Sequence, residues 1–197
     1  TDDNFRSFVK YSQSLQAEVC KARVDKLQDY GVPINFEDVE NNFPKSTLGK
    51  IAILRTMLSD ENCTQYFKEQ HGDVDVKQIF NLYLGRSSVV HHVKTSNFIS
   101  WEESANEIHK AGGIVIAAHP SIYAKDPSEL EKHFKVVDGL EVQPKFNDKN
   151  ISFENYALDK GMAVTYGSDF HDAKYQTMLK NGECSLDKAT IRILGLS

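Results

Sequence analysis

The sequence predicts an α/β fold with a parallel sheet, because strand-like and helix-like segments alternate through its second half. The expected elements alternate strand and helix in the order 113–118, 127–135, 138–143, 150–160, 162–167 and 186–194. The first of these strands is a continuous apolar run, which is typical of a strand buried on both faces. A helix with the capping-box residues Ser100 and Glu103 precedes it. Three strands are too few to close a barrel.

The first half of the chain is predicted to be helical. Apolar residues recur at helical spacing from residue 3 to about residue 30, where Gly31 is expected to end the first helix. Shorter helices follow between residues 33 and 86, and one of them is expected to begin with Ser46 or Thr47 as its N-cap.

Side chains that can bind a metal ion follow two of the predicted strands. His119 comes directly after the first strand, and Asp169 and His171, two residues apart, come shortly after the last one. The carboxyl ends of parallel strands are the place where α/β folds build their sites. Pro120 has no N–H to donate, so it is expected to end the strand and hold His119 in an extended conformation. Two imidazoles and a carboxylate suit a divalent metal ion, which makes these three residues the predicted ligands.

The composition excludes several classes of partner. The 197 residues carry a net charge of −5 and have a pI near 5.8, whereas a protein that binds duplex nucleic acid needs a basic face. A small phosphorylated substrate remains compatible, since a few lysines in a cleft are enough to bind it. The three cysteines lie far apart, which argues against a disulfide framework and favours a cytoplasmic location. No apolar run is long enough to span a membrane, so no membrane partner is expected.

Both metal-binding motifs extend into longer runs of residues. The first reads Gly112-Gly113 and then Ala118-His119-Pro120, and the second reads Gly167-Ser168-Asp169-Phe170-His171. In this order and spacing the runs resemble those of the PHP (polymerase and histidinol phosphatase) phosphoesterases. The segment from residue 137 to 142 is similar to the middle strand of that family. The helical stretch before Gly112 resembles the branch that hydrolyses nucleoside bisphosphates or very short oligonucleotides.

The resemblance implies a distorted (β/α)7 barrel, of which this chain would supply the C-terminal part. Residues 1–32 would be a helix associated with the barrel, residues 33–98 a helical insert, and residues 99–197 the last βα units. The family opens with a His-x-His motif on its first strand, and this chain begins Thr1-Asp2-Asp3 without one. The N-terminal part of the same barrel is therefore an expected missing partner, and we expect the isolated chain to be weakly active or inactive.

The resemblance also implies a metal-dependent phosphoesterase that hydrolyses a small nucleotide or a short oligonucleotide with metal-activated water. Mn, Zn and Fe ions all suit the ligands, and the ligand types do not choose among them. His119, Asp169 and His171 would hold the metal, and the last two would also act in catalysis. Glu141 would orient a ligand; an alternative is a salt bridge or a solvent contact at the end of its strand.

Three basic residues complete the set of candidates. Lys50 and Lys94 are expected to contact a substrate phosphate, because the family branch has basic residues near both positions. The branch usually has a histidine about where Lys50 stands. Arg23 is expected to be structural or to form an i,i+4 ion pair on the helix surface.

Two alternatives to the enzyme remain open. One is a PHP module that has lost ligands and has a structural or regulatory role, which Lys50 and the absent first strand both allow. The other is the PHP part of a larger DNA-processing protein, against which the acidic pI argues.

Overall fold

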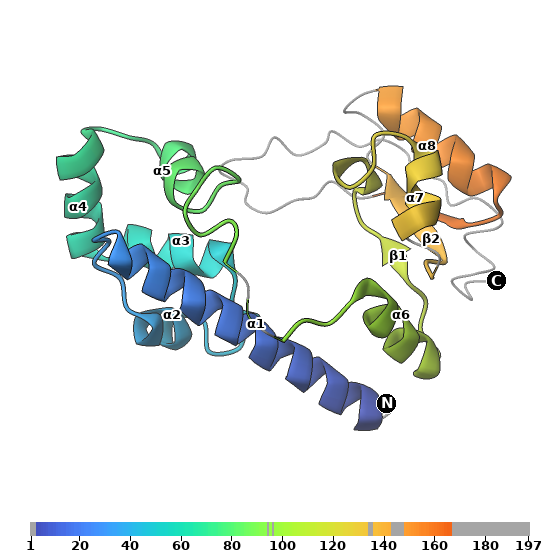
Figure 1. Cartoon of the computed structure of the whole chain (residues 1–197), viewed down its shortest axis with the longest axis horizontal. Helices are drawn as coiled ribbons and strands as arrows, with labels where there is room; N and C mark the ends of the chain where they lie inside the picture. The colour runs from blue at the N-terminus through green and yellow to red at the C-terminus, as the bar shows by residue number, and fades with distance from the viewer. Residues whose placement is uncertain (1–2, 94, 96, 134–135, 143–147, 167–197) are drawn as a thin grey trace. The chain divides into compact units, whose positions relative to one another are not determined.

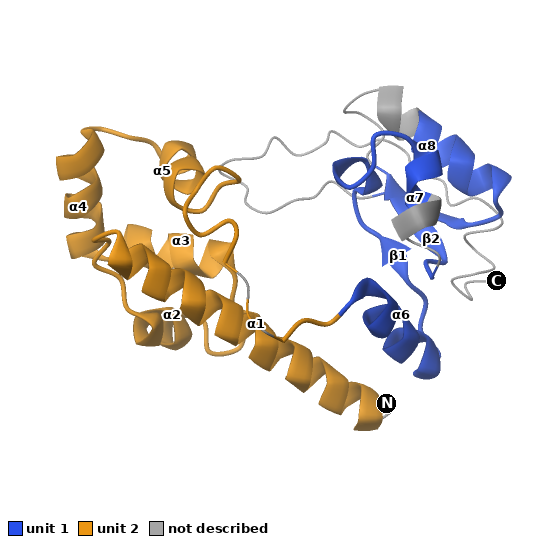
Figure 2. Ribbon diagram, viewed as in Figure 1, with its two compact units in different colours: residues 1, 100–197 blue, residues 2–99 orange. Residues whose placement is uncertain are grey.

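The computed structural model describes residues 3–93, 95, 97–133, 136–142 and 148–166, with helices and strands as drawn in Figure 1. The chain divides into two compact units, which Figure 2 shows in different colours. We call residues 2–99 the helical unit and residues 100–197 the sheet unit. The helix expected at residues 1–32 belongs to the helical unit, and its association with a barrel stays a prediction.

The helical unit contains the predicted helices in the predicted order. They are α1 (Asp3–Asp29), α2 (Phe36–Asn42), α3 (Lys50–Ser59), α4 (Glu61–His71) and α5 (Val76–Tyr83). Helix α1 places Cys20, Val24 and Leu27 on one face because they are spaced by four and three residues, and all three are fully buried. They pack in one core with Ile53 of α3 and Phe67 of α4.

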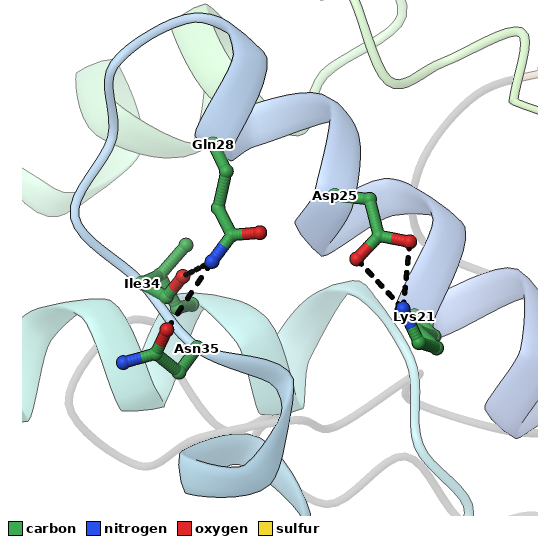
Figure 3. A network of polar contacts seen from close by, with 5 residues as sticks. All are labelled: Lys21, Asp25, Gln28, Ile34 and Asn35. Atoms are coloured by element: carbon green, nitrogen blue, oxygen red, sulfur yellow. Dashed lines mark hydrogen bonds and ion pairs between the residues drawn. The ribbon is translucent and has the colours of Figure 1, made fainter.

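The end of α1 follows from the residues of its last turn. Gly31 has a φ of 83°, and its N–H donates to the Gln28 carbonyl at 2.8 Å while the Val32 N–H donates to Leu27 at 3.1 Å. This is the glycine-ended helix that the sequence predicted. Figure 3 shows the Gln28 side-chain amide donating to the Ile34 carbonyl at 2.8 Å and to Asn35 Oδ1 at 3.2 Å. Gln28 thus ties the end of α1 to the start of α2.

The predicted N-cap of α3 is wrong. Neither Ser46 nor Thr47 caps this helix, because α3 begins at Lys50 and its N-cap is Gly49, which has no side chain to accept a hydrogen bond. The Ser46 N–H instead donates to the Phe43 carbonyl in a turn at 3.1 Å. The buried side chain of Leu48 belongs to the core, so the chain passes through the core before the helix can start.

The sheet unit has the predicted α/β architecture with a parallel sheet. Its elements are α6 (Trp101–Lys110), β1 (Ile116–Ala117), the short 3₁₀ helix η1 (Pro120–Ile122), α7 (Pro127–His133), β2 (Gly139–Val142), α8 (Asp148–Asp159) and β3 (Ala163–Tyr166). The described strands pair in parallel in the order β1-β2-β3, with Ala117 level with Leu140 and Leu140 level with Val164. These three residues form a core with Phe153 of α8. The helix expected at 186–194 lies outside the described residues.

The capping box predicted for α6 is confirmed. The Ser100 hydroxyl accepts from the Glu103 N–H at 3.1 Å, and the Glu103 carboxylate accepts from the Ser100 N–H at 2.8 Å. None of the described helices is both long and apolar enough to cross a membrane.

Strand β1 is shorter than predicted, and the Asp138 side chain contacts the residue that precedes it. The Val115 N–H donates at 2.7 Å to the Asp138 carboxylate, and the same carboxylate oxygen lies 2.7 Å from His109 Nε2. The Val115 carbonyl also accepts from the Asp138 N–H at 2.8 Å and from the Gly139 N–H at 3.2 Å, and strand β1 itself begins at Ile116.

Replacing Asp138 with alanine is expected to lower the free energy of unfolding by about 1–3 kcal/mol, because the Val115 N–H and His109 both lose their acceptor. Chemical denaturation of the variant would measure this loss. The matched control is Asp159→Ala at the exposed end of α8, which should change stability by less than about 0.5 kcal/mol. Equal losses in the two variants would contradict a structural role for Asp138.

Candidate functional site

His119 stands at the carboxyl edge of the sheet, where the sequence placed it, but its backbone is not extended. Its φ of 36° and ψ of 59° are left-handed, and among the described residues it is the one non-glycine residue with a positive φ. Pro120 begins η1 directly after it, and the Ile122 N–H donates to the His119 carbonyl at 3.0 Å. The prediction of an extended His119 is therefore wrong. The chain turns at this residue, and the right-handed helical region is disfavoured before proline.

The imidazole of His119 has a buried atom without a partner. Its Nδ1 is inaccessible to solvent and makes no hydrogen bond with any described residue, whereas the great majority of buried polar side-chain atoms are hydrogen-bonded. The ring stacks on Tyr123, with centroids 5.8 Å apart and planes inclined at 29°. A left-handed backbone and an unpaired ring nitrogen both cost free energy, and such costs concentrate at functional sites. An imidazole nitrogen held in this way fits a metal ligand.

The other predicted ligands lie outside the described residues. Asp169 and His171 follow β3 in sequence, so their convergence with His119 stays a prediction. No group of three or more His, Cys, Asp or Glu side chains suited to a metal ion is present in the described part of the chain.

Glu141 lies near the carboxyl end of β2, level with Thr165 of β3. Its side chain is half-buried and has no hydrogen bond or ion pair with any other described residue. The salt bridge considered for Glu141 is therefore not formed within the described part of the chain. Its role in orienting a ligand stays a prediction.

A second group of functional candidates lies within the helical unit. Lys50 is the first residue of α3, and its ammonium donates to the Leu84 carbonyl at 2.5 Å. Burial, with a smaller effect of Arg23, lowers the pKa of Lys50. Burial also lowers the pKa of His91, assisted by the charges of Lys50, His92, Arg86 and Arg23 in that order. We call these five residues the basic cluster.

The basic cluster contains two further polar atoms without partners. Arg23 Nε and His91 Nδ1 are both buried and make no hydrogen bond with any described residue. Arg23 was expected to be structural or to form an i,i+4 ion pair on the helix surface, and no such ion pair forms within residues 3–93. Arg23 is half-buried, and burial lowers its pKa. None of the ion pairs within the described part of the chain involves a residue of the cluster. Unneutralised positive charge in one place is suited to binding an anion.

The sequence pointed to Lys50 but did not identify the rest of this cluster. Lys94 lies outside the described residues, so its predicted contact with phosphate is untested. His91 was recognised as one of an adjacent pair of which at most one could reach a site, and its ring lies at 4.8 Å from that of His92. The spacing of Arg23 on its helix could have identified a second member. Arg23 is adjacent to the buried Val24 and three residues after the buried Cys20, so it lies near the buried face of α1.

Comparison with known proteins supports the fold. The sequence matches no family model and no curated protein. One similar structure is a candidate metal-dependent phosphoesterase from Bifidobacterium adolescentis, with a TM-score of 0.68 and 21% identity over 94% of this chain and 64% of that one. Another is an amidohydrolase from Chromobacterium violaceum, with a TM-score of 0.57 and 20% identity over 82% of this chain and 56% of that one.

The chain thus spans less than two thirds of the length of either similar protein. At this level of identity the likeness establishes the fold. The chain has an α/β fold similar to that of a metal-dependent phosphoesterase and of an amidohydrolase, with His119 at the carboxyl edge of its parallel sheet.

Proposed function

We propose that the protein containing this chain is a metal-dependent phosphoesterase of the PHP type that hydrolyses a small nucleotide or a short oligonucleotide. The observation that carries the proposal is His119. It combines a left-handed backbone at the end of a strand with a buried Nδ1 that has no hydrogen-bond partner among the described residues. A bound metal would explain why both costs are retained.

The described residues have defined tasks in this proposal. A divalent metal ion bound at this edge would supply a hydroxide from bound water and neutralise charge on the phosphoryl oxygens. His119 would bind it through Nδ1, while stacking on Tyr123 restrains the plane of the imidazole. Asp169 and His171 are proposed as the remaining ligands of this chain, and Glu141 as the carboxylate that orients one of them.

The basic cluster is proposed to bind a phosphate group of the substrate that is not hydrolysed, with Lys50 and Lys94 in contact with it. Two described features support anion binding. Arg23 Nε and His91 Nδ1 are buried without a hydrogen-bond partner among the described residues, and Lys50 stands at the N-terminus of α3, where the helix dipole is positive.

The test of the proposal is ester hydrolysis by the intact protein, measured as phosphate release from mononucleotides and bisphosphates and as mononucleotide release from dinucleotides. The metal-free protein should be inactive, and Mn, Zn or Fe ions should restore hydrolysis of nucleoside monophosphates, nucleoside bisphosphates or dinucleotides. Metal analysis should find the bound ion in the wild type. A protein that binds metal and hydrolyses none of these esters would favour the non-catalytic module. A protein that binds no metal would contradict the proposal altogether.

The basic cluster should bind anions more tightly as the pH falls. The pKa of His91 is held below its usual value of 6.5 by burial and by neighbouring cations, so the ring stays neutral until the pH falls below that value. A bound anion stabilises the charged form of the His91 ring. The ring therefore takes up a proton when the anion binds. We expect inhibition by sulfate, which keeps its charge in this range, to strengthen as the pH falls below about 6.5. His91→Gln should remove this dependence, and an unchanged pH profile would contradict the role of His91.

A further inference from the structure

Lys50 differs from an ordinary surface lysine in its burial and in its partner. Its side chain is half-buried, and its Nζ donates at 2.5 Å to the carbonyl of Leu84, a fully buried residue at the end of α5. No carboxylate of the described residues forms an ion pair with Lys50, whereas the ammonium of Lys21 lies 2.9 Å from Asp25. Lys50 is therefore an amine with a fixed position and an unneutralised charge.

The segment after Leu84 carries other cations of the basic cluster. The Ser88 hydroxyl donates to the Gly85 carbonyl at 2.7 Å, and the His91 N–H donates to the Ser88 carbonyl at 3.1 Å, so this segment is folded by its own turns. The pKa of His91 is lowered first by burial and then by the charges of the other four members of the basic cluster. All four charges must therefore lie near the His91 ring.

We propose that Lys50 is acylated by small acyl phosphates, with the other cations of the basic cluster holding the phosphate group while the amine attacks. An acyl phosphate is a small anion whose activated carbonyl is attached to its phosphate. The same molecule thus carries the group that the cluster attracts and the group that an amine attacks. The place of this modification stands apart from the proposed function. Its effect on hydrolysis rests on that function, since acylation removes the charge that is proposed to bind the substrate phosphate.

The surroundings of Lys50 favour the neutral amine, which is the reactive form. Burial, and to a smaller extent the charge of Arg23, lowers the pKa of Lys50. A lysine that is desolvated or that lies next to another cation is activated as a nucleophile in this way. The hydrogen bond to Leu84 needs only one N–H, so the neutral amine can keep this bond and use its lone pair for attack.

The reaction is an acyl transfer that needs no further reactant. The nitrogen of the neutral amine attacks the carbonyl carbon and a C–N bond forms. The C–O bond to the phosphate breaks, and its electron pair goes to the phosphate oxygen. The proton lost by the nitrogen ends on the departing phosphate, so the products are an uncharged amide at Lys50 and inorganic phosphate. Fixed cations stabilise the negative charge that develops on the leaving group.

Acetyl phosphate is the probe, and peptide mass spectrometry after a short incubation of the intact protein measures acetylation at each lysine. Lys50 should react roughly 10-fold or more faster than Lys68, an exposed lysine of α4, because a site lined by cations raises the local concentration of an anion by at least this order. The uncharged donor 4-nitrophenyl acetate should show a much smaller preference for Lys50. Sulfate should slow the reaction of acetyl phosphate at Lys50 and not at Lys68, relative to chloride at the same ionic strength.

Arg86→Ala tests the cluster without changing the amine. Arg86 is exposed, so the variant should keep its fold, and its Lys50 should react several-fold more slowly with acetyl phosphate and at an unchanged rate with 4-nitrophenyl acetate. The matched control is Arg6→Ala, which removes an exposed arginine of α1 and should leave both rates unchanged. Equal reactivity of Lys50 and Lys68 with acetyl phosphate, or the same preference with both donors, would overturn the proposal.

Kinetic measurements separate this modification site from the proposed function. Lys50→Gln resembles acetylated lysine in having no charge, so it should raise KM for a nucleoside 3′,5′-bisphosphate, and treatment with acetyl phosphate should do the same to the wild type and not to Lys50→Arg. Selective acetylation of Lys50 without a change in KM would support the modification site and contradict the proposed phosphate contact. Uniform acetylation of the lysines together with a raised KM in Lys50→Gln would overturn the modification site and support the phosphate contact.

Discussion

Replacing His119 with alanine is expected to lower kcat/KM for phosphate release by roughly 100-fold or more, together with the metal content of the protein. The physical reason is the loss of the one described nitrogen that is buried at the sheet edge without a partner. Metal analysis after dialysis and steady-state kinetics at saturating metal would measure the two effects. Both should fall together, since in the proposed reaction the metal would supply the nucleophile.

A second variant at the same position separates metal binding from folding. The φ of 36° strains alanine as it strains histidine, whereas glycine adopts left-handed backbone freely. His119→Gly should therefore be as inactive as His119→Ala and more stable by up to about 1 kcal/mol. Thermal denaturation of the metal-free variants would measure this difference. An active glycine variant would show that His119 is not part of the site. If the alanine variant were the more stable of the two, the backbone at position 119 would not be strained.

Local sequence signals predicted most helices of this chain to within a few residues. The capping box of Ser100 and Glu103 and the helix end at Gly31 depend on hydrogen bonds between residues that are close in sequence. Such bonds are specified by the local residues themselves, so they can be read without knowledge of the fold. The parallel order of the strands likewise followed from the alternation of strand and helix.

The errors arose where a distant contact overrode the local signal. The Asp138 side chain accepts the Val115 N–H across 23 residues, directly before β1 begins at Ile116. Leu48 enters the core and displaces the start of α3 from Thr47 to Lys50. Neither contact leaves a pattern in the residues nearby, so only the folded chain reveals them.

The candidate site likewise has one feature that local residues predict and others that depend on the folded chain. The position of His119 at the end of a strand could be predicted, because apolar strands and the polar residues after them are visible in the sequence. Its left-handed backbone could not, since the residue before a proline is more often extended. The basic cluster could be predicted only in part, because Arg23 and His91 are far apart in the sequence and the charge of Arg23 acts on the pKa of His91 only in the folded chain.

Replacing Lys50 with alanine is expected to raise KM for a nucleoside 3′,5′-bisphosphate by roughly 10- to 100-fold and to change KM for a nucleoside 5′-monophosphate much less. A charged hydrogen bond to phosphate contributes about 1.5–3 kcal/mol when water is excluded, and less in a wet site. Loss of a contact with a phosphate that does not react raises KM and leaves kcat nearly unchanged. The measurement is a pair of steady-state titrations on wild type and variant with the same metal.

Lys50 also has a structural contact, which the controls must separate from binding. Its ammonium donates to the Leu84 carbonyl, and Leu84 is fully buried, so Lys50→Ala should also lower the free energy of unfolding by about 1 kcal/mol. Lys50→Arg keeps the charge and should retain most of the preference for the bisphosphate. Lys68→Ala removes an exposed lysine of α4 and should change neither KM nor stability. Equal increases in KM for both substrates would show that Lys50 acts through the fold, and the basic cluster would then have no part in selecting the substrate.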